Sequence, residues 1–384
     1  MKSLLISVLI LVVLFISLSC NEGYDYSQAS LGLGLRDYSC TEAWIEVQIG
    51  SNDKTANIYI KKNGEIIQSV NVGQSSTLYY FDSLLPNTNY TFDAVTYEDG
   101  KEVKSNPVTF TTLDTTSHNF TYEAFTFGQH SSSTLYDVAI INENNIWAVG
   151  EIYMNDSSGN PEPKRYNAIK WNGTNWTVIR IPYNYQGEDF YNPIQSVFAF
   201  GQNDIWFCGN GVIQWNGNSY LPITISSNVW GPYQMNKLWG SSSNDLYVVG
   251  NNGKIAHYNS SQWTKIESST DIDFRDIYGS VNKETNELEI IALASNSGIN
   301  QSKKIVRIKD HTVETLPDSG LANYLSTIWF ISGRKYCIGG QGYYESRTFG
   351  PVWEKNNTIP PFHTTSIRGA GLNDIVLGGS FGLL

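Results

Sequence analysis

The chain is poor in the residue types that bind metals or build disulfide frameworks. Its 384 residues include 4 cysteines and 5 histidines, and neither type recurs at the spacing of a zinc site. After the N-terminal segment the cysteines are Cys40, Cys208 and Cys337, an odd and widely spaced set that does not fit a disulfide framework. Cys208 and Cys337 lie in apolar runs, where cysteine behaves as a small hydrophobic residue. We therefore expect buried structural thiols, and neither a metal nor a cofactor.

Basic residues are also scarce. The 25 lysines and arginines are outnumbered by 36 aspartates and glutamates, for a formal net charge of −11, and no basic cluster occurs. Nucleic-acid binding depends on neutralising phosphates with basic side chains, so the composition argues against that class of partner. The sequence also lacks a nucleophile elbow (Gly-x-Ser-x-Gly), a phosphate loop and the Ser-x-Asp-x-Gly-x-x-Trp box of sialidase propellers. These absences predict a protein that is not an enzyme, with no catalytic residue.

The longest apolar run lies at the N-terminus. It extends over Leu4–Ile16, is too short to span a bilayer, and predicts a signal peptide at residues 1–19. The small residues before Cys20 resemble the end of a bacterial lipoprotein signal, which implies cleavage before Cys20 and lipid on its sulfur. The alternative is an ordinary signal peptide that ends at a cysteine. Residues 20–30 would then be a tether to a membrane of a bacterial cell envelope, the outer membrane being the predicted location.

Residues 31–113 are predicted to form a first domain of short strands. Trp44–Ile49 and Ala56–Ile60 alternate apolar and polar residues, as half-buried strands do. Asn63-Gly64 is a signal for a two-residue hairpin turn, because a type I′ turn needs positive φ at both central positions. No stretch has the period of a helix, so the pattern favours a β-sandwich.

Three features of this domain resemble fibronectin type III domains. Leu85–Tyr90 matches the tyrosine-corner segment, Trp44 stands where the family has its core tryptophan, and Ser105–Thr112 matches the final strand. The resemblance implies a fibronectin type III β-sandwich that serves as a spacer or contact module.

Residues 119–384, which follow a linker at residues 114–118, repeat one phrase. It consists of Asn-Asp or a close variant, a run of apolar and aromatic residues, and a glycine. Clear copies begin at Asn144, Asn203, Asn244 and Asn373. A period of roughly 40 residues with several strands in each unit is the signature of β-propeller blades.

Six blade starts can be counted in these repeats. They are Leu135–Ala139, Gln195–Phe198, Asn236–Gly240, Arg275–Gly279, Ser326–Trp329 and Ser366–Gly369. The last residues fall partway through the sixth blade, so we expect a truncated last blade and a complete ring of about seven. Phe120–Phe127 alternates strongly and is a candidate N-terminal strand for closing the ring. The predicted fold class is therefore all-β.

The residues at repeated positions are expected to have structural roles. Asn-Asp before the second strand is explained by the turn dihedrals that these residues tolerate. The repeated tryptophans are predicted to pack between blades. His257 stands where other repeats have Lys170 and Gln214, and we expect it on a strand surface.

The connections between strands differ in length between the two faces of a propeller. Those from first to second strand are short and uniform, whereas the opposite face carries long and varied ones. The long connections are 153–167, 183–192, 226–234 and 340–350, and all of them contain aromatic residues. One constant face and one variable, aromatic face predict a scaffold with a binding surface.

Aromatic side chains with few charges suit sugar rings or extended peptides, because they offer a large rigid contact area at low entropic cost. The alternative is that these rings only fix their own loops to the scaffold. The candidate ligand-binding residues are Tyr183, Tyr185, Trp230, Tyr233, Tyr343 and Tyr344.

The order of segments resembles surface lipoproteins of the Bacteroidetes/Chlorobi type, in which a fibronectin type III domain precedes a propeller. The resemblance implies a non-catalytic, lipid-anchored binding or adhesion protein whose propeller recognises glycan or protein. Two alternatives stay open. One is a glycan-active enzyme with paired carboxylates on the same face, and the other is a structural component of an envelope complex.

Overall fold

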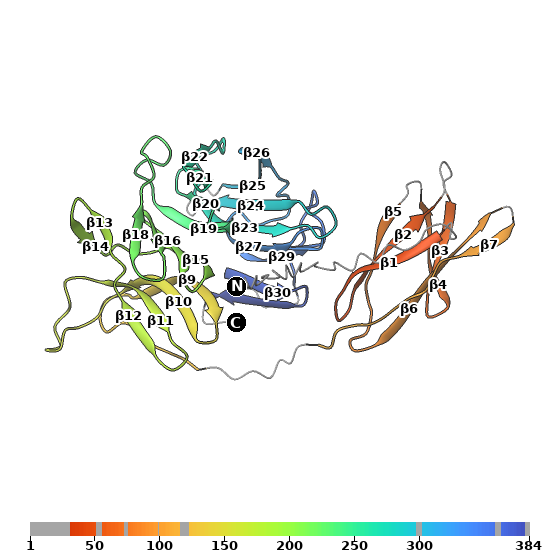
Figure 1. Ribbon diagram of the computed structural model, residues 1–384, viewed down its shortest axis with the longest axis horizontal. Coiled ribbons are helices and arrows are strands. Elements are labelled where there is room, and N and C mark those ends of the chain that lie inside the picture. Colours follow the sequence, from red (N-terminus) through yellow and green to blue (C-terminus); the bar gives the residue numbers. More distant parts are fainter. Residues whose placement is uncertain are drawn as a thin grey trace, which may run out of the picture. The chain divides into compact units, whose positions relative to one another are not determined.

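The computed structural model describes residues 31–50, 56–72, 76–98, 100–115, 123–296, 302–357 and 362–380 (Figure 1). The regular structure of these residues consists of β-strands without an α-helix, which confirms the all-β prediction. The chain divides into two compact units, residues 1–117 and 118–384. The predicted signal peptide, Cys20 and the tether lie outside the described residues. No helix in the described ranges is long and apolar enough to cross a membrane.

The first unit consists of two antiparallel sheets. One has the strand order β1-β2-β5, and the other has the order β4-β3-β6-β7 with β8 paired to β6. The strands are β1 (Leu31–Tyr38), β2 (Ala43–Ile49), β3 (Ala56–Lys62), β4 (Glu65–Val72), β5 (Ser76–Phe81), β6 (Asn89–Glu98), β7 (Lys101–Lys104) and β8 (Val108–Thr111). Asn63 and Gly64 join β3 to β4 with φ of 52° and 87°, as that dipeptide predicted.

Both sheets of the first unit contribute to one hydrophobic core. Ile45 of β2 is fully buried in it. Because side chains alternate along a strand, Trp44 lies on the opposite face of β2, where its ring centroid is 5.2 Å from that of Tyr80. The backbone N–H of Leu85 donates a hydrogen bond of 2.8 Å to the Tyr90 hydroxyl. A bond between a tyrosine hydroxyl and upstream backbone is the defining contact of a tyrosine corner.

The second unit contains six successive antiparallel sheets in the described part of the chain, and a small hairpin, β13–β14. The first sheet has β9 (Thr134–Asn142), β10 (Asn145–Ile152), β11 (Tyr166–Trp171) and β12 (Trp176–Ile179). The hairpin is β13 (Tyr183–Tyr185) and β14 (Glu188–Phe190). The second sheet has β15 (Ser196–Gly201), β16 (Asp204–Cys208), β17 (Val212–Trp215) and β18 (Tyr220–Ile223).

The next sheets repeat the same antiparallel order. The third has β19 (Met235–Ser242), β20 (Asp245–Gly250), β21 (Ile255–Tyr258) and β22 (Trp263–Ile266). The fourth has β23 (Phe274–Val281), β24 (Leu288–Ser295), β25 (Lys303–Lys309) and β26 (Thr312–Thr315). The fifth has β27 (Leu325–Ile331), β28 (Lys335–Gly340) and β29 (Gly342–Ser346), and the sixth has β30 (Thr364–Gly371) and β31 (Asp374–Gly379).

The first strands of the six sheets lie side by side in chain order, and later strands of each sheet lie farther out (Figure 1). This radial order is that of a β-propeller. The predicted blade starts lie in these first strands, except that Gln195 directly precedes β15. Neighbouring sheets are packed together by the repeated aromatic residues. The Trp147 ring centroid, for example, is 5.7 Å from that of Phe207 and 6.4 Å from that of Trp215 in the next sheet.

The repeated glycine has a steric reason. A Cβ atom at Gly150 would lie 2.0 Å from the carbonyl oxygen of Thr134, and one at Gly250 would lie 2.2 Å from that of Gln234. Each carbonyl belongs to the chain that enters the first strand of the same sheet. The glycine is therefore required where the second strand crosses this close approach.

The segment predicted to close the ring does not form a strand where it is described. Residues 123–127 are irregular, and the earlier part of Phe120–Phe127 lies outside the described residues. The rings of Phe125 and Phe127 pack on Trp176 instead, with centroids 6.0 Å and 5.7 Å away. The alternation that suggested a strand thus reflects aromatic contacts with the first sheet.

The predicted long loop at residues 340–350 is also wrong in its first half. Gly342–Ser346 form β29, the third strand of the fifth sheet, so Tyr343 and Tyr344 lie on a strand. Trp353, which follows β29, is buried. Aromatic residues favour strands, and here that preference prevails over the repeat spacing.

Candidate functional site

The first candidate site is the central channel of the second unit. A cavity of about 210 Å³ is lined by β9, β15, β19 and β23 together with Arg368 of β30. Each first strand carries a polar side chain at one equivalent position. This position pairs with the second-strand residue that directly precedes the repeated glycine, or the residue that replaces that glycine. These residues, which we call the inner belt, are Asp137, Ser196, Lys237, Asp276, Thr327 and Ser366.

A β-bulge precedes the belt position in β9, β19, β23, β27 and β30. Bulges re-aim the side chains that follow them. The bulges coincide with the close approach at the repeated glycine, so the same local geometry recurs from sheet to sheet. This recurrence aligns the belt side chains around the channel.

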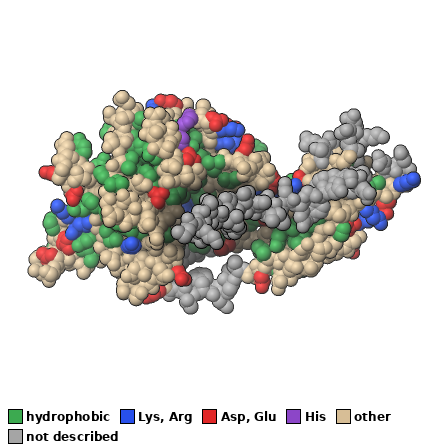
Figure 2. All heavy atoms as spheres, in the orientation of Figure 1, with side chains coloured by type: hydrophobic (Ala, Val, Ile, Leu, Met, Phe, Trp, Pro, Cys, Tyr) green, Lys and Arg blue, Asp and Glu red, His purple; other side chains and the backbone are tan. Residues whose placement is uncertain are grey.

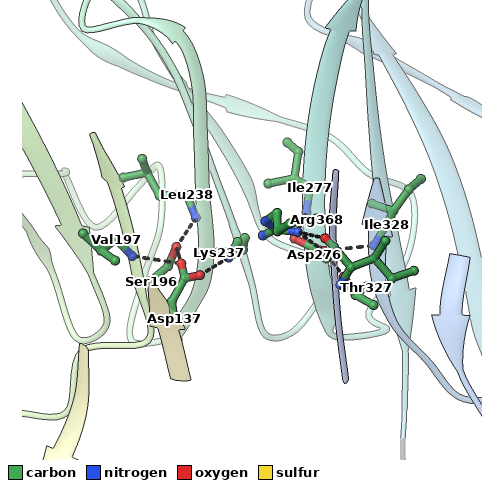
Figure 3. Close-up of polar contacts among 11 residues, drawn as sticks. Asp137, Ser196, Val197, Lys237, Leu238, Asp276, Ile277, Thr327, Ile328 and Arg368 are labelled. Carbon is green, nitrogen blue, oxygen red and sulfur yellow. Dashed lines mark hydrogen bonds and ion pairs between the residues drawn. The ribbon is translucent and has the colours of Figure 1, made fainter. Parts of the chain in front are cut away.

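Asp137 ties three successive sheets together (Figure 3). Its Oδ2 atom accepts hydrogen bonds from Ser196 Oγ at 2.7 Å and from the Val197 N–H at 3.0 Å, both in the second sheet. Its Oδ1 atom lies 2.7 Å from Lys237 Nζ in the third sheet. Ser196 Oγ also accepts a bond of 3.2 Å from the Leu238 N–H, which makes a second link to the third sheet.

Asp276 repeats this arrangement three sheets later (Figure 3). Its Oδ2 atom accepts bonds of 2.9 Å from Thr327 Oγ1 and from the Ile328 N–H. Thr327 Oγ1 accepts a bond of 3.3 Å from the Ile367 N–H of the sixth sheet. Arg368 Nη1, on the same strand as Ile367, lies 3.8 Å from Asp276 Oδ2. Each belt aspartate thus reaches the second sheet beyond its own.

The charges of the belt compensate one another. Burial alone would raise the pKa of Asp137, but the charges of Lys237 and Arg368, together with hydrogen bonds from Lys237 and Ser196, hold that pKa below its ordinary value. Every oxygen of the two belt carboxylates accepts at least one bond, the Oδ1 of Asp276 from the Ile277 N–H at 3.0 Å. Fully engaged carboxylates suit holding a structure together better than proton transfer.

The second candidate site is a groove between the second and third sheets. It has a volume of about 390 Å³, within the range of small-molecule sites. The groove is formed by Tyr183 of β13, the turn that follows β16, and the connection from β18 to β19. Its lining includes Tyr183, Asn210, Gly211, Trp230, Tyr233 and Gln234. The long connections predicted to form a binding face supply most of these residues.

The structure brings three of the six predicted aromatic residues together. Tyr183 and Tyr233 line the groove and are partly exposed, and Trp230 lines it while remaining only 3% exposed. Tyr185 is 57% exposed on the β13–β14 hairpin and does not line the groove. The other two, Tyr343 and Tyr344, are buried within the fifth sheet.

Three of these rings stabilise the scaffold. Trp230 Nε1 donates a 2.6 Å bond to the carbonyl oxygen of Tyr233, which fixes that loop. The Tyr343 hydroxyl lies 3.1 Å from the sulfur of Cys337. The Tyr344 hydroxyl accepts a bond of 3.1 Å from a backbone N–H. The contacts of Trp230, Tyr343 and Tyr344 therefore fit the alternative given above, in which the aromatic rings fix their own segments to the scaffold.

The two exposed rings of the groove are held in place from behind. A Cβ atom at Gly211 would lie 2.4 Å from Tyr183 Cε2, so the ring lies directly against the backbone there. Lys254 Nζ lies 5.1 Å from the ring centroid of Tyr233. Both rings are therefore positioned before any ligand binds, which reduces the entropic cost of binding.

Polar side chains in the groove are uncommitted. The amides of Asn210 and Gln234 and the hydroxyls of Tyr183 and Tyr233 make no side-chain hydrogen bond to other residues in the described part of the chain. The two amides were missed in the sequence, where nothing distinguishes them from other amides near strand ends. Their only signal is that both lie beside the repeated glycine. Asn210 directly follows Gly209, and the carbonyl oxygen of Gln234 approaches Gly250.

Repeated polar residues away from the groove have structural partners. Asp204 Oδ1 accepts bonds from Trp206 Nε1 at 2.8 Å and from Gln214 Nε2 at 2.9 Å. At the equivalent place His257 Nε2 lies 2.7 Å from Asp245 Oδ1. His257 is 7% exposed, so its prediction as a strand-surface residue is wrong. The repeated acid is also more than a turn residue, because it links the second strand to the third.

The prediction of buried thiols is confirmed. Cys40, Cys208 and Cys337 are free and buried, and burial raises the pKa of Cys337 to about 11. In the ranges that the structure describes, no group of three or more His, Cys, Asp or Glu side chains is arranged to hold a metal ion. On the face of the second unit shown in Figure 2, acidic and basic side chains are interspersed.

No protein-family model matches the chain, and no curated protein does. Among solved structures it is similar to YCF48 bound to D1 peptide, with 14% identity, a TM-score of 0.46, and coverage of 91% of this chain and 97% of that chain. It is also similar to the WD40 β-propeller domain of Doa1, with 11% identity, a TM-score of 0.42, and coverage of 67% and 93%. A two-domain fibronectin type III segment of chicken tenascin matches with 13% identity, a TM-score of 0.16, and coverage of 50% and 95%. These likenesses concern the fold alone.

Proposed function

We propose that this protein is a non-catalytic, lipid-anchored binding protein of a bacterial cell envelope, and that it recognises its ligand in the groove between the second and third sheets. The observation that carries the proposal is the set of uncommitted polar side chains beside Tyr183 and Tyr233. Asn210 and Tyr233 are exposed, and Tyr183 and Gln234 are partly exposed, so these groups are accessible to a ligand from solvent. A few convergent polar groups beside aromatic rings are what small-molecule sites use to orient a ligand.

The distribution of carboxylates favours recognition over hydrolysis. A glycoside hydrolase needs two carboxyl groups roughly 5 to 10 Å apart that face its substrate. No Asp or Glu is among the residues that line the groove. The two belt aspartates bond to neighbouring sheets, and neither of them lines the groove.

A larger cavity, of about 580 Å³, does contain carboxylates. Arg307 pairs with Glu289 at 2.9 Å and with Glu314 at 2.8 Å. Glu289 also accepts bonds of 2.7 Å from the hydroxyls of Ser332 and Tyr336. These two carboxylates are thus paired with Arg307 or bonded to hydroxyls of the protein, whereas a glycoside hydrolase needs two carboxyl groups that face its substrate. This cavity therefore supports the glycan-active alternative poorly.

The remaining parts of the proposal concern architecture. The first unit is a fibronectin type III domain that serves as a spacer, which the Leu85–Tyr90 hydrogen bond and the two-sheet core support. The count of about seven blades stays a prediction, and six successive antiparallel sheets are present in the described residues.

The lipid anchor can be tested apart from the groove. We expect the native N-terminal peptide to begin at Cys20 and to carry acyl chains in mass spectrometry, since two or more chains anchor a protein stably. A Cys20→Ser variant should leave the membrane fraction. An unmodified N-terminus in the native protein would refute lipidation without affecting the proposal for the groove.

The binding role is tested with the unlipidated chain on arrays of glycans and envelope proteins, with release of reducing sugar measured in parallel. We expect binding without release. Binding should be lost in the double variant Tyr183→Ala/Tyr233→Ala and retained in Tyr185→Ala, whose ring is exposed but outside the groove. Binding that survives the double variant would place recognition elsewhere, and release of sugar would favour the enzyme.

A further inference from the structure

The groove restricts the charge of its ligand. None of its lining residues is acidic or basic. A charged ligand would lose hydration on entering, which is unfavourable, and no lining residue would supply an opposite charge. Lys254 lies close to the groove, but its ammonium group is placed 5.1 Å from the ring centroid of Tyr233. The composition of the groove therefore selects for a ligand without net charge.

The uncommitted groups match hydroxyl chemistry. The side-chain amides of Asn210 and Gln234 offer both donors and acceptors, and the hydroxyls of Tyr183 and Tyr233 offer one donor and acceptor capacity each. A hydroxyl on a ligand also donates and accepts, so it can satisfy either kind of partner. Extended peptides are usually held by main-chain bonds to a free strand edge. Ile223 of the edge strand β18 also lines the groove, so peptides are included in the test below.

The two rings supply the apolar part of the contact. Tyr183 is supported by the backbone of Gly211, and Tyr233 is held by the bond from Trp230 Nε1 to its carbonyl oxygen. Rigid aromatic rings give a large contact area at little conformational cost. A sugar ring presents apolar C–H groups together with equatorial or axial hydroxyls, and so fits a site with both rings and amides.

We propose that the groove binds an uncharged saccharide, with sugar C–H groups packed on Tyr183 and Tyr233 and sugar hydroxyls bonded to Asn210 and Gln234. This inference rests on the proposed function of the groove and adds the chemical class of the ligand. It separates neutral glycans from acidic or sulfated glycans and from peptides, all of which a binding groove could otherwise take.

The test is calorimetric titration of the unlipidated full chain with neutral oligosaccharides of glucose, mannose, galactose and xylose. Uronic-acid and sulfated oligosaccharides and a peptide library are titrated in parallel. We expect a neutral sugar to bind with an affinity that is nearly independent of salt between low and high NaCl. Asn210→Ala and Gln234→Ala should each weaken binding by about tenfold. Unchanged thermal unfolding of these variants serves as the control for folding.

Variants of opposite charge make the inference sharper. For a neutral sugar, Gln234→Lys and Gln234→Glu should weaken binding to a similar extent. An anionic ligand would instead gain affinity from Gln234→Lys and lose it from Gln234→Glu. Groove-dependent binding of an acidic glycan or a peptide would overturn the inference and leave the proposed function standing. Binding of any ligand that ignores all groove variants would overturn both.

Discussion

The inner belt and the groove are two polar regions of the same unit, and they use their polar atoms in opposite ways. In the belt every carboxylate oxygen of Asp137 and Asp276 accepts a bond from a neighbouring group. In the groove the amides of Asn210 and Gln234 bond to no other residue in the described ranges. The first region is complete by itself, whereas the second has bonding capacity left for another molecule.

The difference shows which polar positions serve the fold and which are available for function. Fully satisfied networks make a structure rigid and unique, but they contribute little to recognition. Charged residues alone would not have indicated the binding site. The belt contains Asp137, Lys237 and Asp276, whereas no charged residue lines the groove. The comparison predicts that belt variants change stability and that groove variants change binding.

The largest effect is expected for Asp276→Ala. It leaves the Thr327 hydroxyl and the Ile328 N–H buried without an acceptor, at a cost of about 3 kcal/mol in the free energy of unfolding. Urea denaturation followed by tryptophan fluorescence measures it, since every tryptophan except Trp44 lies in the second unit. The control is Asp374→Ala, which removes an exposed acid. Equal stability of the two variants would show that the hydrogen bonds of Asp276 do not stabilise the second unit.

The next effect concerns acid. The pKa of Asp137 is held below its ordinary value of 3.8 in the folded chain, so its stabilisation is present above pH 3.8 and is lost as pH falls through the folded pKa. In this acidic range, Asp137→Asn should reduce the slope of the unfolding free energy against pH by at most about 1.4 kcal/mol per pH unit, which corresponds to one bound proton. Asn210→Ala, an uncharged groove variant, should leave that slope as it is. An unchanged slope in Asp137→Asn would contradict the assignment.

A smaller effect on stability and a clear one on binding are expected for Gly211→Ala. The new Cβ would lie 2.4 Å from Tyr183 Cε2 and must displace the ring. We expect affinity for the groove ligand to fall by about tenfold and stability to change by about 1 kcal/mol or less. Gly201→Ala is the matched control, because no atom lies within 4 Å of its added Cβ. Undiminished affinity in Gly211→Ala would show that the position of Tyr183 does not matter.

The smallest effect is expected for His257→Gln. Gln214 occupies the equivalent position and bonds to Asp204 at 2.9 Å, so glutamine should replace the bond from His257 to Asp245. We expect the free energy of unfolding to fall by about 1 kcal/mol or less, measured as a small decrease in the melting temperature. His257→Leu, which removes the hydrogen bond, provides the comparison. A large loss in His257→Gln would mean that the histidine has a role beyond the repeated contact.

The strands of the second unit could be predicted because each repeat carries its own local signals. The glycine and the aromatic run specify a hairpin that packs on its neighbour, and six first strands lie where those signals predicted. Tyr343 and Tyr344 were misplaced because a run of aromatic residues resembles a binding loop until its pairing with β28 is known.

The inner belt could not be predicted, since its partners lie far apart in the sequence. Asp137 is an ordinary polar residue on an alternating strand until Ser196 and Lys237 are brought beside it by sheet packing. The groove was partly predictable, because Tyr183 and Tyr233 stand in long variable connections. Asn210 and Gln234 were not, because an uncommitted amide is recognised only by the absence of partners in three dimensions.

The reach of the belt bears on how the second unit comes apart. In most repeat architectures a unit contacts only its neighbours, so an array can fray one unit at a time. The path from Asp276 through Thr327 to the Ile367 N–H extends across three sheets, as does the one from Asp137 to Lys237. Loss of one sheet would therefore break links held by two others. Such next-nearest-neighbour coupling converts a stack of separable pieces into a single cooperative body.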